Sequence, residues 1–147
     1  MIDPHQAFSL AGLLAMLGWF GLIAALFVPA LRRFAFAAAG ALVPTLLAIA
    51  YILLLAEGLG ASQGGGFGSI DEVRTLFAND AALAAGWLHY LAFDLFVGAW
   101  IAREGLEKGV PRLLLVPCFA LTFLFGPAGL LLFLILRFAF TPKEIRA

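Results

Sequence analysis

The sequence predicts an all-α, polytopic membrane protein with four transmembrane helices, arranged as two hairpins, and a short interfacial helix between spans two and three. Its 147 residues are 64% hydrophobic and only 12% charged, and the mean hydropathy is +1.06. A soluble domain carries about 25% charged residues. Four apolar stretches reach the length of roughly 20 residues that a helix needs to cross about 30 Å of hydrocarbon. One helical domain in a lipid bilayer is therefore expected.

The four predicted spans cover residues 7–31, 34–56, 81–102 and 113–136. Pro29, Arg32 and Arg33 end the first span, and Glu57 ends the second. The charged segment REGLEKGVPR closes the third span, and Arg137 closes the fourth. Short turns join each pair of spans, so every backbone polar group can be satisfied within a helix.

The connection over residues 57–80 is predicted to contain a helix. Ser69 and Glu72 stand in the capping-box relation, just after a glycine-rich stretch. One face of this short helix carries the apolar residues Ile70, Val73, Leu76 and Phe77. We expect it to lie along the membrane surface, and we expect Asp80 to cap the third span. The glycines match no nucleotide-binding pattern.

Charge and residue counts exclude several classes of function. Nine Lys and Arg residues balance nine Asp and Glu residues, so no basic face is expected to bind nucleic acid. One of the two histidines, His5, lies in the N-terminal tail, and no span holds a carboxylate pair at helical spacing. No metal site, haem or other cofactor is therefore predicted. The single cysteine, Cys118, cannot form an internal disulfide.

Proline interrupts two of the predicted spans. Pro44 leaves the carbonyl of Gly40 without its usual donor, and the segment FGPAG at 125–129 does the same to the carbonyl of Phe123. Two interpretations stay open. Such breaks are tolerated in membrane helices and only shape the packing, or they mark a cavity at the centre of the bundle.

The third span contains polar groups in an apolar run, GWLHYLAFDLFVGAWIARE. At helical spacing, one stripe consists of His89, Phe93, Phe96, Trp100 and Arg103. A second stripe, about 140° away, consists of Trp87, Tyr90, Asp94, Gly98 and Ile101. Neither stripe suits lipid, because a charged side chain near the bilayer centre costs at least about 2.5 to 3.5 kcal/mol.

Asp94 is expected near mid-depth, where it faces protein or water, or is protonated. Tyr90 lies one turn earlier on the same face and can donate its hydroxyl to the carboxylate. Asp94 is thus either a polar staple, bonded to a hydroxyl or a freed carbonyl of a neighbouring helix, or a chemical or ligand-binding group. The same two interpretations apply to His89, nearer the surface. Arg103 and Arg137 are expected to mark interfaces.

The aromatic content admits a long apolar ligand. Fifteen phenylalanines suit packing, and a bundle that crosses the bilayer can also enclose a lipid-length molecule. Pairs of small residues predict close helix packing, and two interpretations stay open. Ala11 with Ala15, and Gly98 with Ala102, can bring helices together within one chain or in a homo-oligomer.

The orientation is weakly encoded. In a four-span arrangement five positive charges lie on the side of the two short turns: Arg32, Arg33, Arg103, Lys108 and Arg112. Four lie on the other side: Arg74, Arg137, Lys143 and Arg146. The first span has no positive charge before it and two after it, which predicts that both termini lie outside the cytoplasm.

The segments GWLHYLAFDLFVGAWIAREG and GVPRLLLVPCFALTFLFGPAGLLLFLILR resemble the ABA4-like family, named after abscisic acid-deficient 4, a plastid membrane protein. The resemblance covers most of the chain and is strongest from Trp87 to Arg137. It implies a role with a carotenoid or another isoprenoid, since plant members are tied to neoxanthin formation, the opening of an epoxide to an allenic alcohol. This chain lacks the plant transit peptide, so a bacterial inner membrane is expected.

The isomerisation that the resemblance implies needs an acid at the epoxide oxygen and a base at the adjoining polyene carbon. Asp94 is the candidate acid and His89 the candidate base. Because they lie on different stripes, one of them is expected to act with a group from another span, such as Tyr51 or Thr122. Candidate substrate-binding residues are Tyr90, Trp87, Phe93, Trp100, Arg103, Tyr51 and Thr122. The alternative is a non-catalytic protein that binds such a lipid or supports a partner enzyme.

Overall fold

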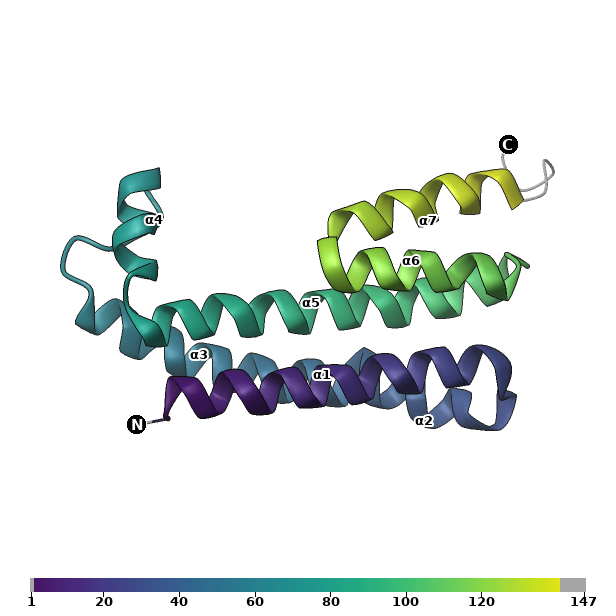
Figure 1. Ribbon diagram of the computed structural model, residues 1–147, viewed down its shortest axis with the longest axis horizontal. Helices are drawn as coiled ribbons and strands as arrows, with labels where there is room; N and C mark the ends of the chain where they lie inside the picture. The colour runs from purple at the N-terminus through teal and green to yellow at the C-terminus, as the bar shows by residue number, and fades with distance from the viewer. Residues whose placement is uncertain (1, 141–147) are drawn as a thin grey trace.

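The structure is a computed structural model that describes residues 2–140, and no strand occurs in this part of the chain. Three apolar helical segments are long enough to cross a membrane: α1 (Pro4–Phe27), the segment Pro29–Ala61, and α5 (Asp80–Glu107). They lie side by side and alternate in direction along the chain (Figure 1). The prediction of an all-helical membrane protein is confirmed.

The second of these segments absorbs Pro44 without ending. A 3₁₀ turn (Pro29–Leu31) leads into α2 (Arg32–Ala37), a π-helical turn (Ala38–Leu42) and α3 (Val43–Ala61). The missing N–H of Pro44 removes one α-helical bond, and the turn before it widens. The N–H of Val43 reaches back to the carbonyl of Ala38. The predicted break is thus a local π-bulge in a helix that continues.

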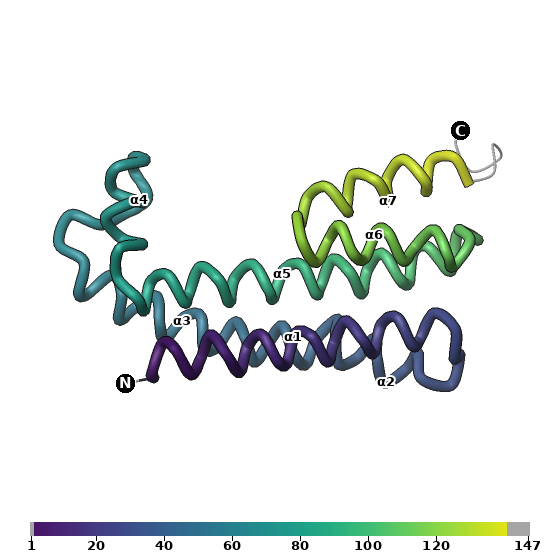
Figure 2. Tube along the Cα trace, in the orientation of Figure 1, coloured from purple at the N-terminus to yellow at the C-terminus, as the bar shows by residue number. Residues whose placement is uncertain are grey.

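The prediction of a single fourth span over 113–136 is wrong. The chain forms two helices there, α6 (Arg112–Phe125) and α7 (Pro127–Phe140), and reverses at Gly126, whose φ is +47°. Figure 2 shows α6 running back beside the second half of α5, and α7 returning toward the end from which α6 started. Gly126 adopts a conformation that other residues avoid, and Pro127 cannot continue the preceding helix. Together they fold the apolar stretch in half.

The α6–α7 hairpin is closely packed and too short to cross a bilayer twice. A Cβ on Gly129 would lie 2.2 Å from both the backbone nitrogen and Oγ1 of Thr122, so only glycine fits at this crossing. Each helix has 14 residues. At 1.5 Å per residue that is about 21 Å, against about 30 Å of hydrocarbon. The hairpin has the dimensions of a re-entrant element that turns back at mid-depth.

This hairpin changes the placement of the chain's two ends. Pro4 and Phe140 lie at opposite ends of the helix bundle (Figure 1). An ion pair supports the return of α7, since Nη2 of Arg137 lies 2.8 Å from Oε1 of Glu104, near the C-terminal end of α5. The expectation that both termini lie on the same side assumed an unbroken fourth span and does not match this fold.

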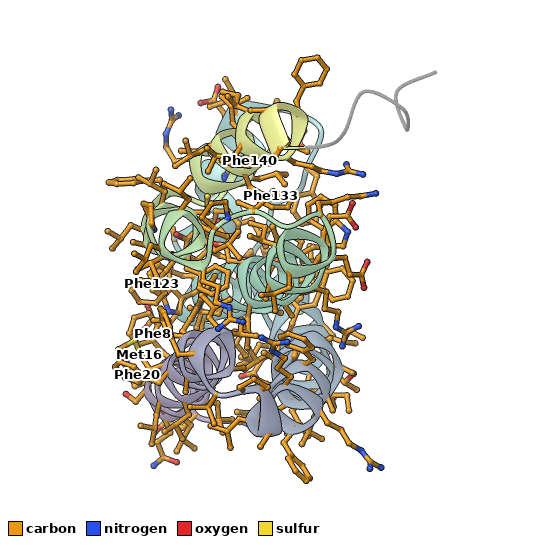
Figure 3. All side chains as sticks on the ribbon, turned by 90° about the vertical axis from the view of Figure 1, so that its right-hand side faces the viewer. Phe8, Met16, Phe20, Phe123, Phe133 and Phe140 are labelled. Atoms are coloured by element: carbon orange, nitrogen blue, oxygen red, sulfur yellow. The ribbon has the colours of Figure 1, made fainter. Side chains whose placement is uncertain are left out.

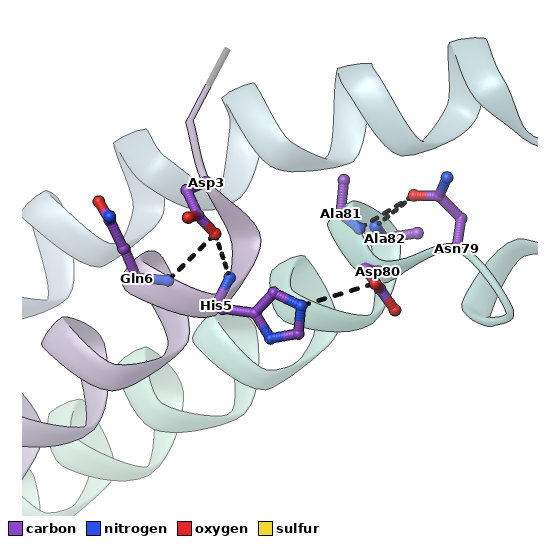
Figure 4. Close-up of polar contacts among 7 residues, drawn as sticks. All are labelled: Asp3, His5, Gln6, Asn79, Asp80, Ala81 and Ala82. Atoms are coloured by element: carbon purple, nitrogen blue, oxygen red, sulfur yellow. Dashed lines mark hydrogen bonds and ion pairs between the residues drawn. The ribbon is translucent and has the colours of Figure 1, made fainter.

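The connection before α5 contains the predicted short helix, α4 (Ile70–Phe77), which lies across the end of α5 (Figure 1). Ser69 caps it by accepting a hydrogen bond from the N–H of Glu72 at 3.2 Å, as predicted. The cap of α5 is Asn79 and not Asp80, because the Asn79 side chain accepts from two backbone N–H groups (Figure 4). Asp80 instead lies 3.8 Å from Nε2 of His5, next to the start of α1.

Small residues let α1 and α5 approach within one chain. The indole of Trp19 occupies the space beside Gly98, where a Cβ would lie 2.4 Å from the ring. The same indole meets Phe119 and Phe123 of α6 edge-on, at centroid distances of 5.7 and 6.0 Å. The small residues predicted to mediate helix contacts are buried inside the chain: Ala11, Ala15, Gly98 and Ala102.

Candidate functional site

Asp94 lies midway along α5 and faces the tip of the α6–α7 hairpin. Asp94 is half-buried, and its Oδ1 would lie 3.0 Å from a Cβ placed on Gly126. Its Oδ2 is buried and has no hydrogen-bond partner among residues 2–140. The carboxyl group therefore faces protein rather than lipid and keeps capacity for a further hydrogen bond.

Tyr90 holds the hairpin tip through the carbonyl that Pro127 leaves without a donor. Its hydroxyl donates to the carbonyl oxygen of Phe123 at 2.9 Å. Asp94 lies one turn further along α5, on the same face as Tyr90. The predictions that the Phe123 carbonyl is freed and that these two side chains share a face are both confirmed. The expected donation from Tyr90 to Asp94 is wrong, because the single hydroxyl hydrogen is given to the Phe123 carbonyl.

An apolar groove leads from the surface to this polar group. Its outer part is a cavity of about 450 Å³ lined by Phe8, Phe77, Asp80, Trp87 and Tyr90, among others. Its inner part is a cavity of about 240 Å³ lined by Gly12, Met16, Trp87, Tyr90, Leu91, Phe123 and Leu124. Phe8, Met16 and Phe123 lie on the same flank of the bundle (Figure 3). Trp87 and Tyr90 line both cavities, so the two cavities are adjacent and together form one groove.

The wall of the groove is aromatic. Trp87 stacks between Phe8 of α1, at a centroid distance of 5.3 Å, and Tyr90 of α5, at 5.4 Å. The groove exists because the hairpin covers only the second half of α5, so the first half of α1 and α5 has no helix packed over this flank (Figure 1). It ends at Phe123 and Leu124 of the hairpin, where Tyr90 supplies a polar atom. Asp94 lies one turn beyond Tyr90 on α5 and lines neither cavity.

His89 lies in a different place from Asp94. Its imidazole contacts the ring of Tyr51 at a centroid distance of 5.6 Å and that of Phe93 at 4.7 Å. It lines a separate cavity of about 230 Å³ with Tyr51, Leu55, Phe67, Phe77 and Gly86. The structure thus does not bring the candidate acid and the candidate base together, as their separation on the helix predicted.

The other-span partners named for catalysis have contacts of their own. Tyr51 lies beside His89. Thr122 is fully buried and donates its hydroxyl to the carbonyl of Cys118 at 2.8 Å, within its own helix. This bond and the close approach of Gly129 make Thr122 part of the hairpin packing.

Three further candidates line no part of the groove. Phe93 lines a cavity of about 300 Å³ beside Pro44, on the α3 side of α5. Trp100 packs edge-on against Phe133 of α7 at 5.3 Å. Arg103 donates from Nη2 to the carbonyl of Phe36 at 2.9 Å and so joins α5 to α2.

Sequence reasoning missed the residues that complete the groove. Phe8, Gly12 and Met16 come from the first span, and Leu124 and Gly126 come from the hairpin tip. The pair Gly126–Pro127 was the available signal, because glycine directly before proline allows a reversal that proline alone does not. Within residues 2–140, no three His, Cys, Asp or Glu side chains are grouped to hold a metal ion.

Comparison with known proteins gives a family. A family model described as ABA4-like, "ABA DEFICIENT 4-like", matches residues 6–133, which is most of the chain. No curated protein and no solved structure matches the chain. The matched region includes the whole groove from Phe8 to the hairpin tip, together with Tyr90 and Asp94. The chain belongs to the ABA4-like family of membrane proteins.

Proposed function

We propose that the protein binds a carotenoid or a related isoprenoid in the groove between α1 and α5, with an oxygenated end of the ligand at Asp94 and Tyr90. The observation that carries the proposal is an apolar, aromatic groove beside a polar pair. Tyr90 lines both cavities of the groove. Asp94, one turn further along α5, has a buried Oδ2 with no hydrogen-bond partner within residues 2–140. A ligand oxygen there would complete its hydrogen bonding.

The dimensions of the groove support a long and narrow ligand. Asp80 lines the outer cavity, and Asp94 stands fourteen residues further along α5, just beyond Leu91 of the inner cavity. At 1.5 Å per residue this separation is about 21 Å. A polyene lying along Trp87 and Phe8 would thus bury a large part of its length and leave the remainder at the surface. Ligand sites of this type are largely apolar with a few polar groups that fix orientation.

The direction of the Tyr90 hydrogen limits how Tyr90 could bond to Asp94. A tyrosine hydroxyl has one hydrogen, and that of Tyr90 is directed at the Phe123 carbonyl. Tyr90 can therefore bond to Asp94 only by accepting a hydrogen from a protonated carboxyl group. Asp94 in that form is able to give its proton to an epoxide oxygen bound beside it.

One carboxyl group is sufficient for a balanced isomerisation. Asp94 would donate a proton to the epoxide oxygen as the carbon–oxygen bond opens. Its carboxylate would then accept a proton from the adjoining polyene carbon, which regenerates the acid. The product is a single allenic alcohol, an isomer of the epoxide, formed without gain or loss of electrons. In this scheme His89 has no part in the reaction, since it lines another cavity.

The competing function is non-catalytic binding, or support of a partner enzyme. The hydrogen bond from Tyr90 to the Phe123 carbonyl favours this non-catalytic function, because it shows that Tyr90 helps to hold the hairpin tip against α5. In that case the groove would hold the same class of ligand, and Asp94 would orient it without transferring a proton.

Pigment binding is tested by purifying the protein from a bacterial host that makes carotenoids and recording its absorption spectrum. We expect a polyene spectrum that co-purifies with the wild type. Gly12→Leu should remove it, because Gly12 lines the inner cavity and a side chain there meets no protein atom within 4 Å. Gly60→Leu is the matched control, since Gly60 is equally free of neighbours and lines none of these cavities. A folded but colourless wild type would contradict the proposal.

Catalysis is tested with Asp94→Asn in cells that supply an epoxy-carotenoid. Loss of a general acid is expected to lower product formation by about 100-fold or more, while the pigment still binds. His89→Gln, on the other face of α5, should leave turnover unchanged. Normal turnover in a folded Asp94→Asn protein would exclude the acid role and leave the binding function.

A further inference from the structure

The two ends of the bundle carry opposite charge. Of the seven Lys and Arg residues among residues 2–140, six belong to the end where α1 passes into α2 and α5 passes into α6: Arg32, Arg33, Arg103, Lys108, Arg112 and Arg137. That end has two carboxylates, Glu104 and Glu107. The opposite end has Arg74 and five carboxylates: Asp3, Glu57, Asp71, Glu72 and Asp80. The bundle therefore has a basic end and an acidic end.

The hairpin is the cause of this separation. In a four-span arrangement Arg137 would lie at the end opposite to Arg112. In the structure α7 returns, and the ion pair between Arg137 and Glu104 fixes Arg137 at the basic end. Lys143 and Arg146, which entered the weak five-to-four distribution expected from the sequence, lie outside the described residues. The hairpin thus turns a weak charge difference between the two ends of the bundle into a clear one.

We infer that the basic end lies in the cytoplasmic leaflet, against anionic lipid headgroups, and that the ligand groove opens toward the opposite, non-cytoplasmic leaflet. Positive charges in short loops next to membrane helices are retained on the cytoplasmic side, and the anionic lipids of that leaflet attract them. The N-terminal end of α1 then lies outside the cytoplasm, and the C-terminal end of α7 lies inside.

The direction of the groove follows from its lining. Its outer cavity includes Pro4, His5, Phe77 and Asp80, which belong to the first turns of α1 and α5 and to the end of α4. All these elements lie at the acidic end (Figures 1 and 4). The α6–α7 hairpin closes the groove at mid-depth and fills the half of the bundle nearest the basic end. A bound lipid would enter and leave through the non-cytoplasmic leaflet, a point that rests on the proposed function.

Orientation is tested by labelling single cysteines in intact bacterial cells with a membrane-impermeant maleimide. The full chain carries Cys118→Ala together with either Gln63→Cys or Glu107→Cys. Both positions are exposed, Gln63 at the acidic end and Glu107 at the basic end, and neither change removes a positive charge. We expect Gln63→Cys to be labelled in intact cells and Glu107→Cys only after permeabilisation. The reverse pattern, or equal labelling of both in intact cells, would overturn the inference.

A reporter at the C-terminus tests the hairpin itself. Green fluorescent protein fused to the C-terminus should fluoresce, and alkaline phosphatase at the same place should be inactive, because both report a cytoplasmic location. A C-terminus on the same side as Gln63→Cys would show a fourth span and overturn the inference. These readouts need no ligand, so a colourless protein with the expected labelling would refute the proposed function alone.

Discussion

Proline interrupts two apolar segments of this chain, and the two interruptions end differently. At Pro44 the helix widens by a π turn over Ala38–Leu42 and continues to Ala61. At Pro127 the chain reverses, and α7 runs back along α6. Each proline removes the same backbone donor. The difference lies in the residue before the proline, which is the β-branched Val43 in one case and Gly126 in the other.

Helix α5 stabilises both interruptions with a polar side chain. Arg103 donates to the carbonyl of Phe36, in the turn before the π-helical segment, and Gly40 leaves room for the guanidinium, since a Cβ there would lie 3.2 Å from Nη2. Tyr90 donates to the carbonyl of Phe123, in the turn before the reversal. Both donors lie on α5, about three and a half turns apart. At Pro127 the neighbouring helix thus supplies the missing donor, and at Pro44 it donates to a backbone carbonyl one turn away from the one that proline frees.

Gly129→Ala is expected to have the largest effect on this comparison. Its new methyl group would lie 2.2 Å from the Thr122 backbone nitrogen, which cannot move without opening the hairpin. Overpacking of this kind costs about 1 to 3 kcal/mol and more where the backbone is the obstacle. Thermal unfolding in detergent should show a large loss of stability, or no folded protein. Gly12→Ala is the control, since nothing lies within 4 Å of its Cβ position. Equal stability of the two variants would show that the hairpin is not closely packed.

Gly126→Ala should have the next largest effect. The combination of φ +47° and ψ −97° is sparsely populated by residues other than glycine and costs alanine about 1 to 3 kcal/mol. The added Cβ would also stand 3.0 Å from Oδ1 of Asp94. The two causes can be separated by repeating the substitution in an Asp94→Ala background. We expect part of the loss of stability to be recovered there, because the crowding is relieved while the backbone strain remains. No recovery would mean that Asp94 does not pack on the hairpin tip.

Tyr90→Phe is expected to have a smaller effect, since it removes one hydrogen bond and keeps the ring against Trp87. Hydrogen bonds between membrane helices contribute roughly 0.6 kcal/mol on average. Tyr51→Phe is the matched control, because Tyr51 also packs its ring on α5 but has no hydrogen bond to the hairpin. The midpoint of thermal unfolding should fall for Tyr90→Phe by more than for Tyr51→Phe. A larger fall in the midpoint for Tyr51→Phe would show that the bond from Tyr90 to the Phe123 carbonyl does not stabilise the hairpin.

The sequence was sufficient to predict the membrane class, the three long helical segments and the shared face of Tyr90 and Asp94. These features depend on composition and helical periodicity, which are local properties. The reversal at Gly126 was not predicted, because residues 113–136 have the hydropathy of a span and both Pro44 and Pro127 suggested a kink. Which outcome each proline gives depends on the residue before it and also on tertiary contacts, here the donors on α5 and the fit of Gly129 against Thr122.

The candidate site was predicted in part for the same reason. Periodicity separated His89 from Asp94, and the structure places them in different surroundings. Helical periodicity could not predict the groove. Phe8 and Met16 line it together with Tyr90 only because the hairpin leaves that flank of α1 and α5 uncovered. Two further candidates have packing roles instead. Trp100 packs against α7, and Arg103 donates a hydrogen bond to α2.

Pro44→Ala is expected to have the smallest effect of these substitutions. Proline in the middle of a regular helix costs about 3 kcal/mol relative to alanine, but here the π turn already accommodates it and Val43 bonds to the Ala38 carbonyl. The new N–H can restore the α-helical bond to Gly40 only if α2 rotates relative to α3. The bond from Arg103 to Phe36 opposes that rotation. We therefore expect a change in unfolding midpoint of at most a few degrees and an unchanged labelling pattern at Gln63→Cys and Glu107→Cys. A loss as large as that of Gly126→Ala would show that the π turn, like the reversal, is required for the fold.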